Sequence, residues 1–148
     1  MTDIVSPEKR SRMMSGIRGK NTKPELILRK ILFRNGFRYR LHRKDLPGKP
    51  DIVLAKWNAA IFVHGCFWHR HSGCRLTTTP ATRPEFWKQK FEANVDRDKR
   101  NKAQLLAAGW RVAIVWECGM RKDPELIAAR LSDWLMTNHE RSAEFTTS

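Results

Sequence analysis

The sequence predicts a single α/β domain with helices flanking a mixed central sheet, and three observations support this. Short runs at 51–55, 60–63 and 112–116 are almost entirely apolar, which is typical of strands covered on both faces. Segments with helix-starting residues precede and follow these runs. The chain of 148 residues, of which 41% are hydrophobic, is long enough to build the core of one ordinary domain.

Each expected helix begins with a capping residue, a first-turn proline or an early acidic residue. Two glycines, Gly36 and Gly109, follow helical stretches at positions where helices commonly end. Phe37 to Leu41 alternates apolar and basic residues, as a one-sided strand does, and a proline-rich turn follows it. The helix-starting segments are Ser6-Pro7-Glu8, Thr22 with Glu25 in a capping box, Arg83-Pro84-Glu85 and Asp123-Pro124-Glu125.

The charge of the chain favours a polyanionic partner. Lys and Arg number 29 against 15 Asp and Glu, which gives a formal net charge of +14 and makes nucleic acid the first candidate. No apolar run approaches the roughly 20 residues of a membrane span, so we expect a cytosolic protein with no membrane partner. A basic surface alone would also suit solubility, or binding of ribosomal RNA without catalysis.

One short segment, Gly65 to Cys74, holds two of the three cysteines and two histidines. Thiolate and imidazole are the ligands that zinc prefers in closed structural sites. Three cysteines cannot all pair in disulfides, and a reducing compartment leaves them free for metal. We therefore expect a zinc site, although buried reduced cysteines are the alternative. Its expected ligands are Cys66, His71, Cys74 and Cys118.

Asp51 begins a predicted central strand directly after Pro50. If residues 56–59 form the hairpin loop, the antiparallel register places Asp51 about opposite His64. A carboxylate and an imidazole at one sheet edge, within a basic protein, suit a metal-dependent nuclease, with the carboxylate binding Mg²⁺. The alternative is a turn aspartate that bonds nearby backbone amides.

Several motifs, in this order, resemble the very-short-patch-repair mismatch endonuclease family. The resemblance implies a restriction-endonuclease-like fold, a structural zinc, and Mg²⁺-dependent nicking of one DNA strand on the 5′ side of the thymine in a T·G mismatch. Such mismatches arise when 5-methylcytosine deaminates. The motifs are Leu46 to Asp51, His64 to His69, Pro80 to Arg83 with Phe86-Trp87, Asn94-Val95 with Arg97-Asp98, and Gly109 to Val112 with Val115 to Cys118.

The resemblance also implies the roles of individual residues. Asp51 is similar to the family's direct metal ligand, and His69 to the catalytic histidine that handles the proton of the attacking water. His64 and Glu25 resemble residues that hold metal-bound waters, although Glu25 also suits the capping box. Val63 stands where the family usually has a threonine that binds metal. If the ligand is the backbone carbonyl of this residue, valine can provide it as well as threonine. Two Mg²⁺ ions are expected.

Four side chains resemble the apolar residues that the family inserts into mismatched DNA. A wobble pair stacks more weakly than a matched pair, so inserting a side chain beside it costs less free energy. This difference in free energy makes binding selective for the mismatch. This role leads us to expect aromatic rings displayed on a basic surface, with a core position as the alternative for Trp87. The four residues are Phe67, Trp68, Trp87 and, on the N-terminal helix, Met14.

These expectations divide the chain into a basic, DNA-contacting arm (1–21), an endonuclease core (22–138) and a frayed tail (139–148). The expected partner is double-stranded DNA with a T·G mismatch, bound by a monomer in the bacterial cytoplasm and, on DNA, at the nucleoid. A functional link to a cytosine-5 DNA methyltransferase and to mismatch-repair proteins is also expected. Two other functions remain open: a restriction-type endonuclease that cuts both strands, and a zinc-stabilised nucleic-acid-binding module without catalysis.

Overall fold

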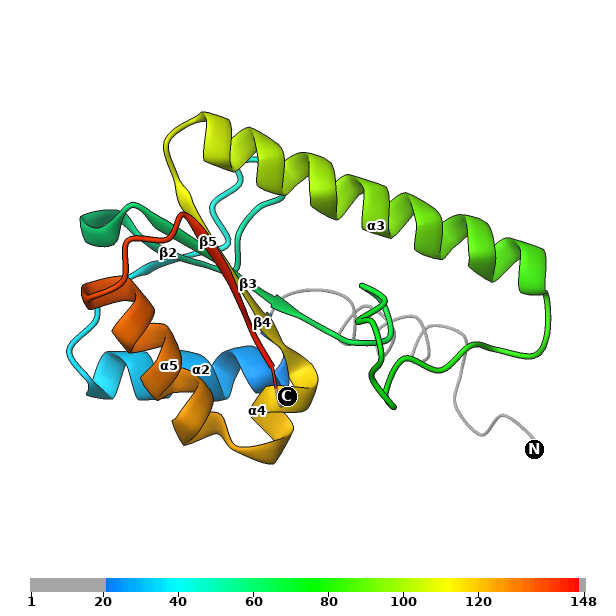
Figure 1. The fold of residues 1–148 in the computed structure, drawn as a ribbon, viewed down its shortest axis with the longest axis horizontal. Coiled ribbons are helices and arrows are strands. Elements are labelled where there is room, and N and C mark those ends of the chain that lie inside the picture. Colours follow the sequence, from blue (N-terminus) through cyan, green and yellow to red (C-terminus); the bar gives the residue numbers. More distant parts are fainter. Residues whose placement is uncertain (1–20, 147–148) are drawn as a thin grey trace.

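A computed structural model of the protein describes residues 21–146 (Figure 1). Its elements alternate between helices and strands, as the sequence predicts for an α/β domain. In chain order they are α2 (Lys23–Arg34), β1 (Arg40–Leu41), β2 (Ile52–Leu54), the 3₁₀ turn η1 (Ala55–Trp57), β3 (Ala59–His64), α3 (Pro84–Ala107), β4 (Arg111–Trp116), α4 (Glu117–Lys122), α5 (Pro124–Met136) and β5 (Ser142–Phe145).

The strands form one mixed sheet in the order β1-β2-β3-β4-β5. The pairs β1–β2 and β2–β3 are antiparallel, whereas β3–β4 and β4–β5 are parallel. Parallel neighbours need long crossover connections, and α3 supplies one while α4 and α5 supply the other. The predicted fold class, a mixed sheet flanked by helices, is confirmed.

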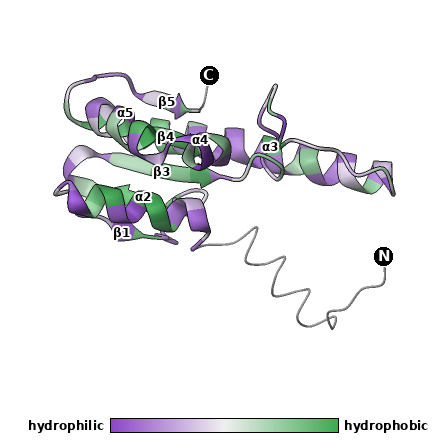
Figure 2. Cartoon of the chain, turned by 90° about the horizontal axis from the view of Figure 1, so that it is seen from below, coloured by the Kyte–Doolittle hydropathy of each residue, from purple (hydrophilic) through white to green (hydrophobic). Residues whose placement is uncertain are grey.

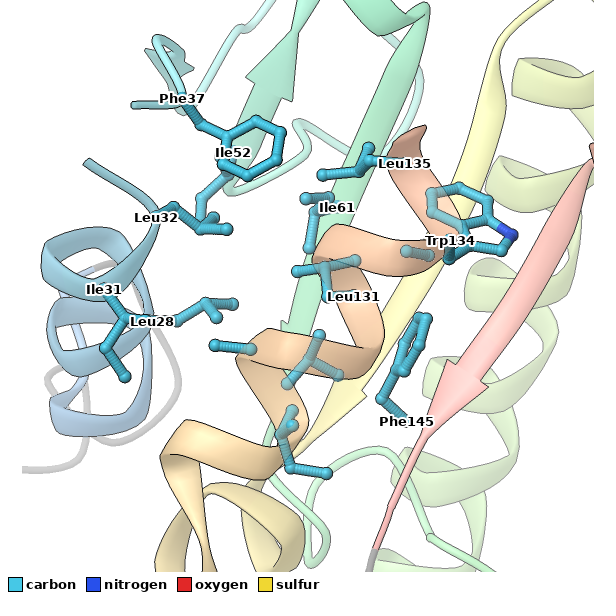
Figure 3. Close-up of a cluster of buried hydrophobic side chains, with 14 of the residues drawn as sticks. Leu28, Ile31, Leu32, Phe37, Ile52, Ile61, Leu131, Trp134, Leu135 and Phe145 are labelled. Atoms are coloured by element: carbon cyan, nitrogen blue, oxygen red, sulfur yellow. The ribbon is translucent and has the colours of Figure 1, made fainter. Parts of the chain in front are cut away.

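Helices cover both faces of this sheet. Alternate residues of a strand point to opposite faces, so Ile61 packs with α2 and α5 in the larger core (Figure 3), while Ala60 and Phe62 pack with Leu105 of α3. Figure 2 shows the hydrophobic colouring concentrated on the central strands and adjoining helices, while α3 carries many hydrophilic residues. No helix among residues 21–146 is long and apolar enough to cross a membrane.

The helix starts follow the capping residues in the sequence. The Glu25 backbone N–H points at the Thr22 Oγ1 at 3.5 Å, and the Leu126 N–H donates to the Asp123 carboxylate at 3.1 Å. Pro84 opens α3, which continues without a break to Ala107. The short basic helix expected before Gly16 lies outside the described residues.

The expectation of a frayed C-terminal tail is wrong for residues 142–145. These residues form β5, which pairs in parallel with β4 from Val112↔Ser142 to Val115↔Phe145. Phe145 is buried and packs against Trp134, with ring centroids 6.2 Å apart. Main-chain pairing and one buried ring are enough to order this short edge strand.

The expected strand register is also wrong, by two residues. Ile52 pairs with Ile61, so Asp51 lies next to Phe62 instead of His64. The hairpin connection spans 55–58 because η1 begins at Ala55, and Asn58 adopts a left-handed φ of 50°. A shift of two residues keeps every side chain on its face, so Asp51 and His64 still share one side of the sheet.

Candidate active site and metal centre

The four expected zinc ligands come together in space. Their ligand atoms all lie within 4.8 Å of one another, with Cys118 brought in by the turn from β4 into α4. The Nδ1 of His71 lies 3.6 Å from the Cys66 Sγ and 3.5 Å from the Cys118 Sγ. A tetrahedral zinc with ordinary bond lengths places sulfur and nitrogen ligands about 3.5–3.6 Å apart. The geometry therefore fits zinc.

Neighbouring side chains hold the His71 imidazole in place. The Trp116 ring stacks on it at 4.2 Å between centroids, and the Trp116 Nε1–H donates to the Glu144 Oε1 at 2.7 Å. Burial lowers the pKa of His71, partly opposed by Glu144, and burial raises the pKa of the Cys66 thiol. A neutral imidazole is the form that binds metal, while a metal ion would have to displace the thiol proton.

A cavity of about 680 Å³ is lined by the C-terminal end of β3 and by His69 of the loop that follows it. Asp51 lines it from the residue before β2, His64 from the end of β3, and His69 from the loop between β3 and α3. The structure thus brings three of the expected catalytic residues to one place. Basic side chains complete much of the remaining wall: Lys44, Lys49, Arg97 and Lys102.

Asp51 is half-buried in the wall of the cavity. Its Oδ2 accepts a hydrogen bond from the Val63 N–H at 2.8 Å. Burial raises the pKa of Asp51 to about 7; the Val63 hydrogen bond opposes this rise, and the nearby Glu25 carboxylate adds to it. A divalent cation would offset both the burial and the repulsion. The N–H and C=O of a strand residue point to the same edge, so the Val63 carbonyl also faces the Asp51 side.

Asp51 should make the metal-free fold less stable as pH rises. Its folded pKa of about 7 exceeds the ordinary value, so the folded state keeps a proton that the unfolded chain has released. The free energy of unfolding should therefore fall between about pH 4 and 7, by on the order of 4 kcal/mol, and level off above. Asp51→Asn cannot ionise but keeps an acceptor for the Val63 N–H. Urea unfolding without Mg²⁺ should show that Asp51→Asn is more stable than the wild type, by a difference in unfolding free energy that grows from pH 5 to 7. A difference independent of pH would contradict the raised pKa of Asp51.

His64 and His69 stack face to face, with centroids 3.7 Å apart and planes 4° from parallel. Burial holds the pKa of His64 well below its ordinary value, and His69 lowers it further. The Nδ1 of His69 lies 2.6 Å from the Asp98 Oδ2. A carboxylate only accepts, so Nδ1–H donates to it and Nε2 is left as the basic nitrogen.

Sequence reasoning missed the role of Asp98. It appeared within one of the motifs, but nothing in the local pattern of α3 shows that its carboxylate reaches a loop 29 residues away. Its partnership with His69 follows the general arrangement in which a carboxylate fixes the tautomer and orientation of a catalytic imidazole.

His69→Ala should lower the rate of DNA cleavage by about 10²–10⁴, the usual contribution of a positioned acid or base. Asp98→Ala should lower it less, because the imidazole remains but loses its orientation. Single-turnover cleavage at saturating Mg²⁺ measures both. His139→Gln, a change at an exposed histidine outside the cavity, is the control. Full activity in His69→Ala would remove His69 from the chemistry.

Glu25 serves the helix start and the site together. Its Oε1 accepts from the Asn21 N–H at 3.1 Å, while its Oε2 accepts from the Arg29 Nη1 at 2.8 Å and lies 2.8 Å from the His42 Nε2. The side chain is 1% exposed. Ligand atoms of Glu25, His42 and Asp51 lie within 4.8 Å of one another, so a metal ion could be held here. Sequence reasoning gave His42 no role.

The aromatic residues expected as wedges form a packed cluster. Trp68 is only 6% exposed, and its ring meets Phe67 edge-on at 4.9 Å and lies 5.9 Å from Trp87. The expectation that Trp68 is displayed on the surface is therefore wrong, because the first half of α3 closes over the loop through Phe91. Phe67 and Trp87 are half-buried. Met14 lies outside the described residues.

Trp68→Ala should lower the free energy of unfolding by roughly 3–5 kcal/mol, as loss of a large buried ring does. The matched control is Phe86→Ala, since Phe86 lies beside Trp87 but is 43% exposed. Chemical denaturation of the zinc-loaded proteins measures both changes. A loss below about 1 kcal/mol for Trp68→Ala would mean that the ring does not support the free fold.

A half-buried carboxylate and an aspartate-oriented histidine beside basic side chains suit a nuclease. The fold is similar to the catalytic domain of the homing endonuclease I-Bth0305I, with a TM-score of 0.55 and 22% identity, covering 81% of this chain and 100% of that chain. This likeness shows the fold.

Sequence relatives define the family. The model of the family described as DNA mismatch endonuclease Vsr matches residues 2–75. The chain is 51% identical over 135 residues to the type II nicking enzyme V.XorIIP of Xanthomonas oryzae pv. oryzae (91% of this chain, 98% of the relative). It is 41% identical over 139 residues to the DNA mismatch endonuclease Vsr of Escherichia coli (91% and 88%). The chain belongs to the Vsr family of DNA mismatch endonucleases, which confirms the resemblance and the prediction of a DNA endonuclease.

Proposed function

We propose that this protein nicks one DNA strand on the 5′ side of the thymine in a T·G mismatch, in a reaction that depends on Mg²⁺. The observation that carries the proposal is the convergence of Asp51, His64 and the His69–Asp98 pair on one basic cavity in a member of this family. T·G mismatches arise from deaminated 5-methylcytosine, so the substrate links the enzyme to a cytosine-5 DNA methyltransferase and to mismatch-repair proteins. We expect it to act as a monomer.

The expected catalytic residues have distinct roles in this proposal. Asp51 and the Val63 carbonyl would hold the catalytic Mg²⁺, with two ions expected in the site, while Glu25 and His64 would orient water. When bound, Mg²⁺ supplies Lewis-acid activation of the attacking water and stabilises the leaving oxygen. The Nε2 of His69 accepts the proton of that water, since Asp98 holds Nδ1–H. The backbone carbonyl makes valine an acceptable replacement for threonine at position 63.

The cysteine–histidine cluster has a structural role in the proposal. Zinc held by Cys66, His71, Cys74 and Cys118 would fix the loop that carries His69 between two ligands. A closed set of four protein ligands leaves no open position for substrate. Zinc therefore acts on catalysis only through the placement of His69.

Mismatch selection is assigned to the aromatic cluster. Phe67, Trp68 and Trp87, with Met14 from the other groove, would wedge beside the mismatch, where unstacking is cheaper. Because Trp68 is buried in the free protein, its insertion requires the cluster to open on DNA. The basic cavity wall, including Lys49 and Arg97, would hold the phosphates.

The test is cleavage of a T·G duplex whose two strands carry different fluorescent labels. The proposal predicts one cut, in the thymine strand, on its 5′ side. Cuts in both strands would favour the restriction-type alternative, and tight binding with no cut would favour a binding module. The presence of Asp51, His64 and His69 together argues against a binding module, because such a module needs none of these catalytic residues.

A further inference from the structure

His42 occupies an unusual position beside the proposed catalytic metal site. It follows β1 with a left-handed φ of 49°, and its backbone N–H donates to the Asp51 carbonyl at 3.1 Å. Its imidazole lines the same cavity as Asp51, with 17% of the side chain exposed. The fold therefore ties the backbone of His42 to Asp51 and directs its ring into the site.

The distances around His42 suit a coordination shell. In an octahedral site with bonds of 2.0–2.1 Å, adjacent ligand atoms lie about 2.9 Å apart and opposite ones about 4.1 Å. The His42 Nε2 lies 2.8 Å from the Glu25 Oε2, and ligand atoms of Glu25, His42 and Asp51 lie within 4.8 Å of one another. These distances allow one cation to bond both the Asp51 carboxylate and the His42 Nε2, with Glu25 beside it to orient bound water. The Nε2 proton that faces Glu25 in the metal-free protein would then move to Nδ1 or be released.

A nitrogen ligand changes which cations a site prefers. Mg²⁺ prefers oxygen ligands and water, whereas imidazole suits first-row transition metals. We propose that His42 is a nitrogen ligand of the divalent cation bound by Asp51, and that it widens metal use from Mg²⁺ toward first-row transition metals. This inference rests on the proposed function, since it concerns the metal of the same site.

The test uses Mn²⁺ with the zinc-loaded protein, because Mn²⁺ competes poorly for thiolate sites. Electron paramagnetic resonance gives the Mn²⁺ affinity, and electron spin echo modulation detects a directly bound ¹⁴N nucleus. The key variant is His42→Gln, whose amide can still donate to Glu25 but is a poor metal ligand. His139→Gln is the matched control at an exposed histidine outside the cavity.

We expect a ¹⁴N signal in the wild type and in His139→Gln, and its loss in His42→Gln. The variant should also bind Mn²⁺ about 10-fold more weakly, the lower end of effects at metal sites, with a smaller change for Mg²⁺. An unchanged Mn²⁺ affinity in His42→Gln would overturn the proposal and leave His42 as a hydrogen-bond donor to Glu25. Persistence of the ¹⁴N signal would also overturn it, since the nitrogen would then come from His64 or His69.

The two proposals fail in different ways. If the protein nicks T·G duplexes while His42→Gln binds Mn²⁺ like the wild type, the proposed function stands and the role of His42 falls. If the ¹⁴N signal is lost in His42→Gln but the wild type does not nick T·G duplexes, the ligand assignment stands and the proposed function falls.

Discussion

Asp51→Asn is expected to abolish DNA cleavage while sparing binding to mismatched duplexes. Asparagine removes the charged oxygen that anchors the cation, but its amide oxygen still accepts from the Val63 N–H. The loss of a negative charge beside the phosphates should leave binding equal or stronger. Single-turnover cleavage at saturating Mg²⁺ measures the chemistry, and fluorescence anisotropy with a labelled T·G duplex measures binding.

The control for this experiment is Asp133→Asn, at an exposed carboxylate of α5 that does not line the cavity. It should cleave like the wild type. Full single-turnover activity in Asp51→Asn would remove Asp51 from the metal site. Loss of cleavage together with loss of binding and of thermal stability would point instead to a damaged fold.

The second large effect concerns zinc. Cys118→Ser removes the one ligand that ties the loop after β3 to the start of α4. The free energy of binding at a structural zinc, about 10–16 kcal/mol in small zinc domains, is folding free energy. It is comparable to the entire stability of an ordinary domain, about 5–15 kcal/mol. We therefore expect loss of zinc, unfolding of at least the loop, and loss of cleavage.

Elemental analysis and scanning calorimetry of purified protein measure these changes. The wild type should hold one zinc per chain, as should Ser72→Ala, a change at an exposed position of the same loop. A folded, active Cys118→Ser protein, or an active wild type with substoichiometric zinc, would contradict a structural zinc on these four residues.

Local sequence rules predicted most helices and central strands, because nearby residues determine where these elements begin and end. Capping residues at Thr22 and Asp123 and the proline at Pro84 set where helices begin, and nearly continuous apolar runs identified the central strands. β5 was missed because Ser142–Phe145 is only four residues long, and becomes a strand only by pairing with β4. Its strand conformation depends on pairing with β4, which rules based on neighbouring residues in the sequence do not include.

The site was predictable where chemistry restricts the choice. The cysteines are few, and their preference for zinc led to Cys118 although it lies 47 residues from His71. Asp98 and His42 carry no such signal, since aspartate and histidine are common on surfaces and only the fold brings them to His69 and Glu25. The burial of Trp68 depends in the same way on the packing of α3 over its loop.

The most direct test of the proposed activity compares two end-labelled duplexes that differ at one position, T·G in one and C·G in the other. Both are incubated with zinc-loaded protein under single-turnover conditions, with and without Mg²⁺. The account predicts one Mg²⁺-dependent nick, 5′ to the mismatched thymine, and no cut in the C·G duplex. Equal cleavage of both duplexes, or cleavage of the T·G duplex without Mg²⁺, would contradict it.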